Sequence, residues 1–211
     1  MESKSSRSLH RFITIAVVAF SVVAGAAPAS AGTSVSPCAQ EDLGQPFLRW
    51  ADPLYYKLAP NGGLEQGSTS WLLSGGARII DQNEPFHVGN ATDGHSLVLP
   101  PGSSATTAAT CVSLLDPSLR LFTVNTGSPL SVLKVEALYT DALGYSRSTT
   151  VSLLIGLNTW QPSLPVAFLA QLANPPLLTD GRTSVAFRFT PVGKLGNWKI
   201  DDVYVDPFKG R

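Results

Sequence analysis

The chain has 211 residues, with 15 basic and 15 acidic side chains and a formal net charge of zero at pH 7. A chain of this length forms one domain with a sizeable core. It has no basic stripe, which argues against nucleic acid and anionic membranes as partners.

Residues 1–31 are predicted to be a secretory signal peptide. A basic start is followed by an apolar stretch over 12–27 and by Ala29-Ser30-Ala31, the small-x-small pattern of a cleavage site. A retained membrane anchor is the alternative, but the stretch is short for a spanning helix, which needs about 20 residues. Cleavage would lower the 15 basic and 15 acidic residues to 12 and 14. We therefore expect a secreted protein with no membrane contact after cleavage.

Two cysteines, Cys38 and Cys111, remain after the predicted cleavage. Exported chains meet an oxidising compartment, so an even pair predicts a disulfide. Closing so long a loop would stabilise the fold by roughly 4 kcal/mol. Two buried free thiols are the alternative. A metal site is not expected, because two isolated cysteines do not show the spacing of metal ligands.

Residues 32–60 are predicted to be an N-terminal extension that packs on the outside of a single domain over 61–208. From Asn61 onward, short apolar runs are broken by Gly, Pro, Asn and Asp, which is typical of a sandwich or barrel. Prolines over 161–178 argue against a long helix there. Strands are expected over 71–74, 77–81, 96–99, 110–114, 119–126, 131–139, 148–155, 165–170, 184–190 and 198–205.

The clearest strand signal is the alternation over 184–190. Val185, Phe187 and Phe189 fall on one face, and polar or small residues fall on the other. A two-residue period needs one buried and one wetter face, as in each sheet of a sandwich. The fold class is therefore predicted to be all-β, an antiparallel two-sheet sandwich.

Two segments carry a recognisable pattern: Asn-Gly-Gly-Leu-Glu-Gln-Gly over 61–67, followed by Trp71, and Gly-Asn-Trp-Lys-Ile-Asp-Asp-Val-Tyr-Val over 196–205. They resemble the opening and closing strands of galactose-binding-like jelly rolls, in particular the carbohydrate-binding modules of xylanases and cellulases. The resemblance covers about residues 61–206 and implies that the opening and closing strands are neighbours. The whole chain also resembles small exported actinobacterial proteins.

The same resemblance implies a structural calcium ion near these strands, with Glu65 and Asp201 as ligands. On a regular strand Asp201 would share a face with Val203 and point inward, where a carboxylate is costly unless it is paired or bound to a metal. Hydrogen bonds from backbone N–H groups, or a pair with Arg78, are the alternatives. Asp202 is expected to face solvent.

Sugar sites stack aromatic rings on pyranose faces and fix hydroxyl groups with polar side chains. Candidate contacts are Tyr145 in a hairpin turn, Trp160 and Tyr139. Packing is the alternative for each, and it is the expectation for Trp71 and Trp198.

Catalysis is poorly supported by the sequence. His87 and His95 lie in a Gly/Asn/Asp-rich region and are expected to be exposed loop residues, with a metal site including Asp93 as the alternative. No nucleophile elbow, zinc motif or phosphate loop occurs. We expect a monomeric, non-enzymatic secreted protein that recognises extracellular or cell-wall carbohydrate. An envelope structural or adhesion protein that binds another protein is the second hypothesis, and a glycoside hydrolase is the third.

Overall fold

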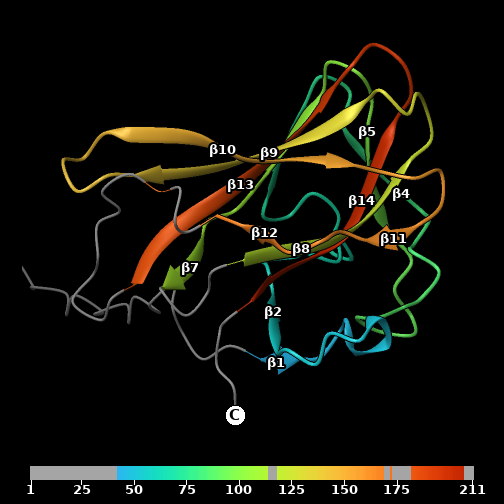
Figure 1. Cartoon of the computed structure of the whole chain (residues 1–211), viewed down its shortest axis with the longest axis horizontal. Coiled ribbons are helices and arrows are strands. Elements are labelled where there is room, and N and C mark those ends of the chain that lie inside the picture. The colour runs from blue at the N-terminus through green and yellow to red at the C-terminus, as the bar shows by residue number, and fades with distance from the viewer. Residues whose placement is uncertain (1–41, 114–117, 169–171, 173–181, 207–211) are drawn as a thin grey trace, which may run out of the picture. The chain divides into compact units, whose positions relative to one another are not determined.

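Two antiparallel sheets make up the protein in the computed structural model, which describes residues 42–113, 118–168, 172 and 182–206 (Figure 1). The predicted signal peptide and Cys38 lie outside these residues, so the leader and the Cys38–Cys111 disulfide stay predictions. Cys111 is buried in β7 (Thr110–Ser113). In the described part of the chain, no helix has the length and hydrophobicity to cross a membrane.

The first sheet contains the last strand of the chain at its centre. Its order is β1-β2-β14-β5-β4; β8 also pairs with β14, and β11 and β12 pair with β8. Its strands are β1 (Leu43–Gly44), β2 (Tyr56–Leu58), β4 (Arg78–Ile80), β5 (Ser96–Leu99), β8 (Ser118–Asn125), β11 (Gln161–Pro162), β12 (Val166–Ala167) and β14 (Trp198–Asp206).

The second sheet has the order β10-β9-β13-β6-β3, and β7 pairs with β13. Its other strands are β3 (Trp71–Ser74), β6 (Ser104–Thr107), β9 (Val132–Thr140), β10 (Ser146–Ile155) and β13 (Arg182–Val192). The predicted all-β jelly-roll sandwich is therefore confirmed. Of the described strands in this sheet, β6 was missed because its Ser-Ala-Thr-Thr sequence has almost no apolar signal.

The main core lies between the sheets and follows the predicted alternation. Val185, Phe187 and Phe189 of β13 are fully buried, and Trp71 and Trp198 pack in the same core. A residue period of two places these side chains on one face of each strand, so the sequence pattern alone is sufficient to define the core.

A second, aromatic cluster covers the outer face of the first sheet. Phe47 and Tyr56 from the N-terminal segment pack against Phe122 of β8 and Tyr204 of β14. The rings of Phe47 and Phe122 stack with centroids 5.4 Å apart. Within this segment, β1 and β2 extend the sheet, and the short 3-10 helix η1 (Leu48–Trp50) lies between them in the sequence. The segment therefore adds strands to the sheet and also covers its outer face.

A partly buried ion pair connects this segment to the sheet. Arg120 of β8 binds the carboxylate of Asp52, and Tyr56 donates a 2.6 Å hydrogen bond to the same carboxylate. The guanidinium of Arg120 also lies 4.1 Å from the ring centroid of Phe47. The strand and the segment are thus connected by charge, hydrogen bonding and ring packing together.

The expected opening strand over 61–67 is wrong, because that segment is a run of turns. Asn61, Leu64 and Gly67 have φ values of 50°, 64° and 61°, which a strand does not accommodate. The neighbour of β14 is β2 instead, and the backbone of Gly62 then pairs with Val203. Leu64 still enters the main core, so the predicted proximity of the opening and closing segments is confirmed.

Phe47→Ala is expected to lower the free energy of unfolding by about 3–5 kcal/mol, because it empties the centre of the aromatic cluster. Urea denaturation measures the loss. The matched control is Leu72→Ala on β3, whose side chain is 72% exposed and whose removal should change stability by less than about 0.5 kcal/mol. An equal, small effect of both changes would show that the segment does not stabilise the sandwich.

An acidic pocket beside the last strand

A pocket of about 560 Å³ opens where β14 meets the segments 42–46, 61–66 and 88–93. Its polar wall includes Asn61, Glu65, Gln66, Asn90, Asp93 and Asp202. None of the residues that line it is basic. The pocket therefore has an acidic character in a chain that is neutral as a whole.

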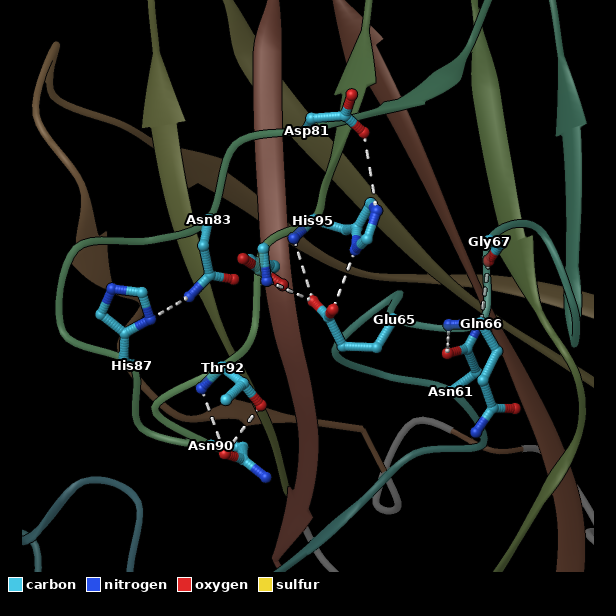
Figure 2. A network of polar contacts seen from close by, with 12 residues as sticks. Asn61, Glu65, Gln66, Gly67, Asp81, Asn83, His87, Asn90, Thr92 and His95 are labelled. Carbon is cyan, nitrogen blue, oxygen red and sulfur yellow. Dashed lines mark hydrogen bonds and ion pairs between the residues drawn. The ribbon is translucent and has the colours of Figure 1, made fainter.

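Asn61 folds the loop that carries Glu65 (Figure 2). Its amide nitrogen donates to the carbonyls of Gly67 at 2.9 Å and Thr69 at 2.7 Å, and its amide oxygen accepts from the backbone N–H of Gln66 at 3.1 Å. An asparagine tolerates the left-handed backbone found here, and its side chain supplies hydrogen-bond partners for the backbone groups of the loop. The loop can then present side chains without a regular strand.

The carboxylate of Glu65 is held by His95 and its neighbour (Figure 2). Oε1 accepts from the backbone N–H groups of Gly94 and His95 at 3.0 and 2.9 Å, and Oε2 lies 2.8 Å from His95 Nδ1. Burial disfavours the charge, yet these hydrogen bonds keep the pKa of Glu65 below its ordinary value. His95 Nε2 lies 3.6 Å from Asp81, and the bond to Glu65 raises the pKa of His95.

The last strand contains a β-bulge next to the pocket. The pairing of β14 with β8 shifts between Asp201 and Tyr204, and Asp202 adopts a φ of 49°. The extra residue changes the alternation, so Asp201 does not share a face with Val203 as a regular strand would require. The predicted orientation of Asp201 is therefore wrong, although its burial is confirmed.

Asp201 accepts two backbone hydrogen bonds, from Glu84 at 3.1 Å and from Asp202 at 2.8 Å. The sequence left open whether the Asp201 carboxylate accepts backbone hydrogen bonds or pairs with Arg78, and the structure shows backbone N–H donors. Burial, and then the charge of Asp202, raises the pKa of Asp201 to about 9. Glu84 is fully buried too, and its carboxylate accepts from the backbone of Phe86 and from Val88 at 2.9 Å.

Asp202 is the main correction to the sequence analysis. It was expected to face solvent, but it is 2% exposed, and a hydrogen bond with the side chain of Glu84 favours its protonated form. A Cβ on Gly63 would lie 3.2 Å from Asp202 Oδ1, so the glycine lets the backbone approach the carboxyl group. Burial, followed by the charges of Glu84 and Asp93, raises the pKa of Asp202 to about 8.

The predicted ligand-binding aromatics have three different environments. Tyr139 is 5% exposed and packs in the main core, so the proposal that it stacks on a ligand is wrong: alternation along β9 turns it inward. Trp160 packs against the aromatic cluster. Tyr145 is 61% exposed in the β9–β10 turn, with the guanidinium of Arg147 5.5 Å from its ring centroid. None of the three lines the acidic pocket.

Of the two predicted metal ligands, Glu65 lines the pocket and Asp201 does not, and sequence reasoning missed the contribution of Asp93, Asp202 and Tyr204 to its wall. His87 is exposed, as predicted, whereas His95 is half-buried against Glu65. Within the described residues, no three His, Cys, Asp or Glu side chains are arranged to hold a metal ion.

Comparison with known proteins identifies the fold. No protein-family model matches the chain, and no curated protein matches it either. The CBM22-1–GH10 modules of Clostridium thermocellum endo-1,4-β-D-xylanase 10B, complexed with xylohexaose, align with a TM-score of 0.50 and 9% identity. The alignment covers 71% of this chain and 28% of that chain.

Two smaller modules align over similar lengths. The CBM22-1 xylan-binding domain of Paenibacillus barcinonensis Xyn10C has a TM-score of 0.47 and 11% identity, covering 71% of this chain and 94% of that one. TmCBM61, in complex with β-1,4-galactotriose, has a TM-score of 0.38 and 19% identity, covering 71% and 97%. Identities this low define the fold alone: this chain has the jelly-roll fold found in carbohydrate-binding modules.

The buried carboxyl groups predict an unusual pH dependence. The pKa of Asp202 is raised on folding, so its stabilising contribution is complete below pH 4 and is lost as the pH rises toward 8. Asp202→Asn is expected to increase the free energy of unfolding at pH 9 by at least about 1 kcal/mol in chelator, with little effect at pH 4.

Chemical denaturation at the two pH values measures this difference. Asp42→Asn is the matched control, because Asp42 is exposed and its removal should leave the pH profile unchanged. If the free energy of unfolding changed with pH in the same way in Asp202→Asn and in the unmodified protein, the claim that folding raises the pKa of Asp202 would be contradicted.

Proposed function

We propose that this protein is a secreted, non-catalytic carbohydrate-binding module and that the acidic pocket is its binding site. The observation that carries the proposal is a jelly-roll pocket lined by four amide residues, Gln45, Asn61, Gln66 and Asn90, among which Gln66 is exposed while the amide of Asn61 is held within its own loop. Planar amides fix sugar hydroxyl groups by paired hydrogen bonds, and a small number of them sets ligand orientation.

The pocket also supplies apolar contact. Leu58 and Val88 line it together with Tyr56 and Tyr204. The C–H faces of a pyranose ring bind such surfaces while its hydroxyl groups remain with the amides. This mixture of surfaces supports a sugar ligand, in agreement with a fold that the CBM22-1 xylanase modules share.

The carboxyl groups of the pocket support binding without hydrolysis. Hydrolysis of a glycosidic bond needs one carboxyl group that protonates the leaving oxygen and a second across the cleft. Glu65 is held by His95, and Asp202 is almost fully covered. Secretion follows from the predicted signal peptide, and an extracellular location suits a module of this fold.

A protein partner is the second candidate function, and one surface favours it. Leu153 and Ile155 at the end of β10 are exposed together with Leu157, and Leu164 lies in the same groove as the first two. Clustered exposed apolar side chains are typical of interaction sites. An adhesion or envelope role would use this surface rather than the acidic pocket.

Retention of the purified protein on insoluble xylan, galactan, chitosan and peptidoglycan tests the proposed function. Gln66→Ala is expected to weaken retention at least about fivefold, because it removes an exposed amide from the pocket. Tyr145→Ala is the matched control and should bind normally. Loss of binding in Tyr145→Ala alone would move the site to the hairpin, and retention by no glycan would leave the protein-partner hypothesis.

We also propose a structural calcium ion, with Glu65 and Asp201 as ligands. Carboxylate oxygens are the donors that calcium prefers, and a cation would offset the cost of the buried carboxyl groups. The side chains do not form a ready-made site, and Glu65 would have to exchange His95 for the ion.

Calcium is expected to raise the melting temperature by several degrees over a chelator-treated sample, because a ligand that binds the folded state stabilises it. Differential scanning calorimetry at fixed pH measures the shift, and magnesium is the control ion. Identical melting temperatures with calcium and with chelator would exclude a structural role for the ion.

A further inference from the structure

A groove of about 490 Å³ lies between β10 of the second sheet and the β11–β12 segment of the first. This groove, here called the β10 groove, has residues 152–155 on one side and residues 161–166 on the other. Leu154 and Val166 line it and are buried, whereas Leu164 is 81% exposed. None of the described residues that line it is charged, and it shares none of them with the acidic pocket. The β10 groove is therefore a second surface of different chemistry on the same domain.

β10 is the last strand of its sheet and presents an open edge to this groove (Figure 1). Within the described part of the chain it pairs with β9 alone, and residues 152–155 follow a regular register after the bulge that ends at Ser152. Backbone N–H and C=O groups of an antiparallel strand alternate between its two sides, so those that point away from β9 face no paired strand. Natural sheets protect such edges with charge or proline, but residues 152–155 read Ser-Leu-Leu-Ile. This edge can therefore accept another strand.

The side chains beside this edge form a partly exposed apolar row. Ile155 lies opposite Val132 of β9, and Val132 lies opposite Val192 of β13. Directly opposite residues point to the same face of a sheet, and Ile155 and Val192 are 76% and 46% exposed. A strand added to β10 would place one residue beside Ile155 and turn its neighbours toward the side of Leu154. Apolar side chains on that strand would then bury surface on both of its faces.

The β10 groove fits a single extended segment better than it fits a second copy of this chain or a membrane. A second copy that paired through β10 would bring its own β11–β12 segment, with the exposed Leu164 and Pro165, into the space beside the edge. A membrane would cover the apolar side chains but leave the backbone groups of the edge without hydrogen bonds. The uncharged lining offers no counter-ion for a charged side chain, so it favours an uncharged partner segment.

We propose that the β10 groove binds an extended, uncharged apolar segment of a partner protein, which adds a strand to β10 at residues 152–155. Backbone hydrogen bonds along the edge supply affinity, and the groove selects the alternate side chains. The inference goes beyond carbohydrate binding and does not depend on it, because the groove and the acidic pocket have no residue in common. It gives the protein-partner hypothesis a binding mode and a chemical class of partner.

Selection of random dodecapeptides by phage display on the full-length protein tests the chemical class. The enriched peptides are expected to share an uncharged stretch of β-branched and aromatic residues without proline, because these residue types favour a strand. Enrichment of charged or helix-forming sequences, or of no sequence, would overturn the inference.

Ile155→Lys tests the location of the site. It is expected to weaken binding of the most enriched peptide, measured by fluorescence polarisation, at least about tenfold, because a lysine beside an open edge opposes strand addition. Leu72→Lys is the matched control, since Leu72 is 72% exposed on β3 at the opposite edge of the same sheet. Melting temperatures of both variants show whether they fold. Equal peptide affinity of Ile155→Lys and the unmodified protein would contradict the proposed location.

Two N-methylated forms of the same peptide, one methylated at its odd and one at its even positions, test strand addition. Only alternate amides of an added strand pair with β10, so one form should bind at least about tenfold more weakly than the other. Unchanged affinity of both forms would show that the edge is not used. A dimer in sedimentation analysis that Ile155→Lys abolishes would show that a second copy occupies the groove instead. Glycan retention by Ile155→Lys should stay unchanged, which separates this inference from the proposed function.

Discussion

The bulge in β14 is the constraint on which the rest of the site depends. One extra residue at the centre of the first sheet places Asp202 in a left-handed conformation and buries two consecutive carboxyl groups. Neither has a cationic side chain among the contacts described above, and burial raises the pKa of both. This arrangement lowers the free energy of unfolding at high pH, and carboxyl groups with such perturbed pKa values cluster at functional sites.

The sandwich stabilises this arrangement from both sides. The main core fixes Val203 on the inner face of β14, while the aromatic cluster around Phe47 covers the outer face. The N-terminal segment therefore has two roles, because it extends the sheet through β2 and lines the pocket through residues 42–46. Fold stability and pocket geometry are coupled through the same side chains.

Periodicity was sufficient to predict most strands and the core, because Val185, Phe187 and Phe189 alternate regularly with polar or small residues. The site depends on features that break this regularity. A bulge at Asp202 adds a residue without any Pro or Gly to signal it, and turns with a left-handed Leu64 replace an expected strand. The adjacent pair Asp201-Asp202 was visible in the sequence, but only the fold brings Gly89 and Asp93 to it.

The central claim is that the fold buries an ionisable carboxyl group, Asp202, among other carboxyl groups, so that it keeps its proton at neutral pH. Carbon-13 NMR of the Asp202 carboxyl group through a pH titration in chelator tests this directly. The structure predicts a pKa near 8, because burial and the neighbouring carboxyl groups Glu84 and Asp93 disfavour the charged form. A titration midpoint close to 3.8 in the free protein would contradict the account.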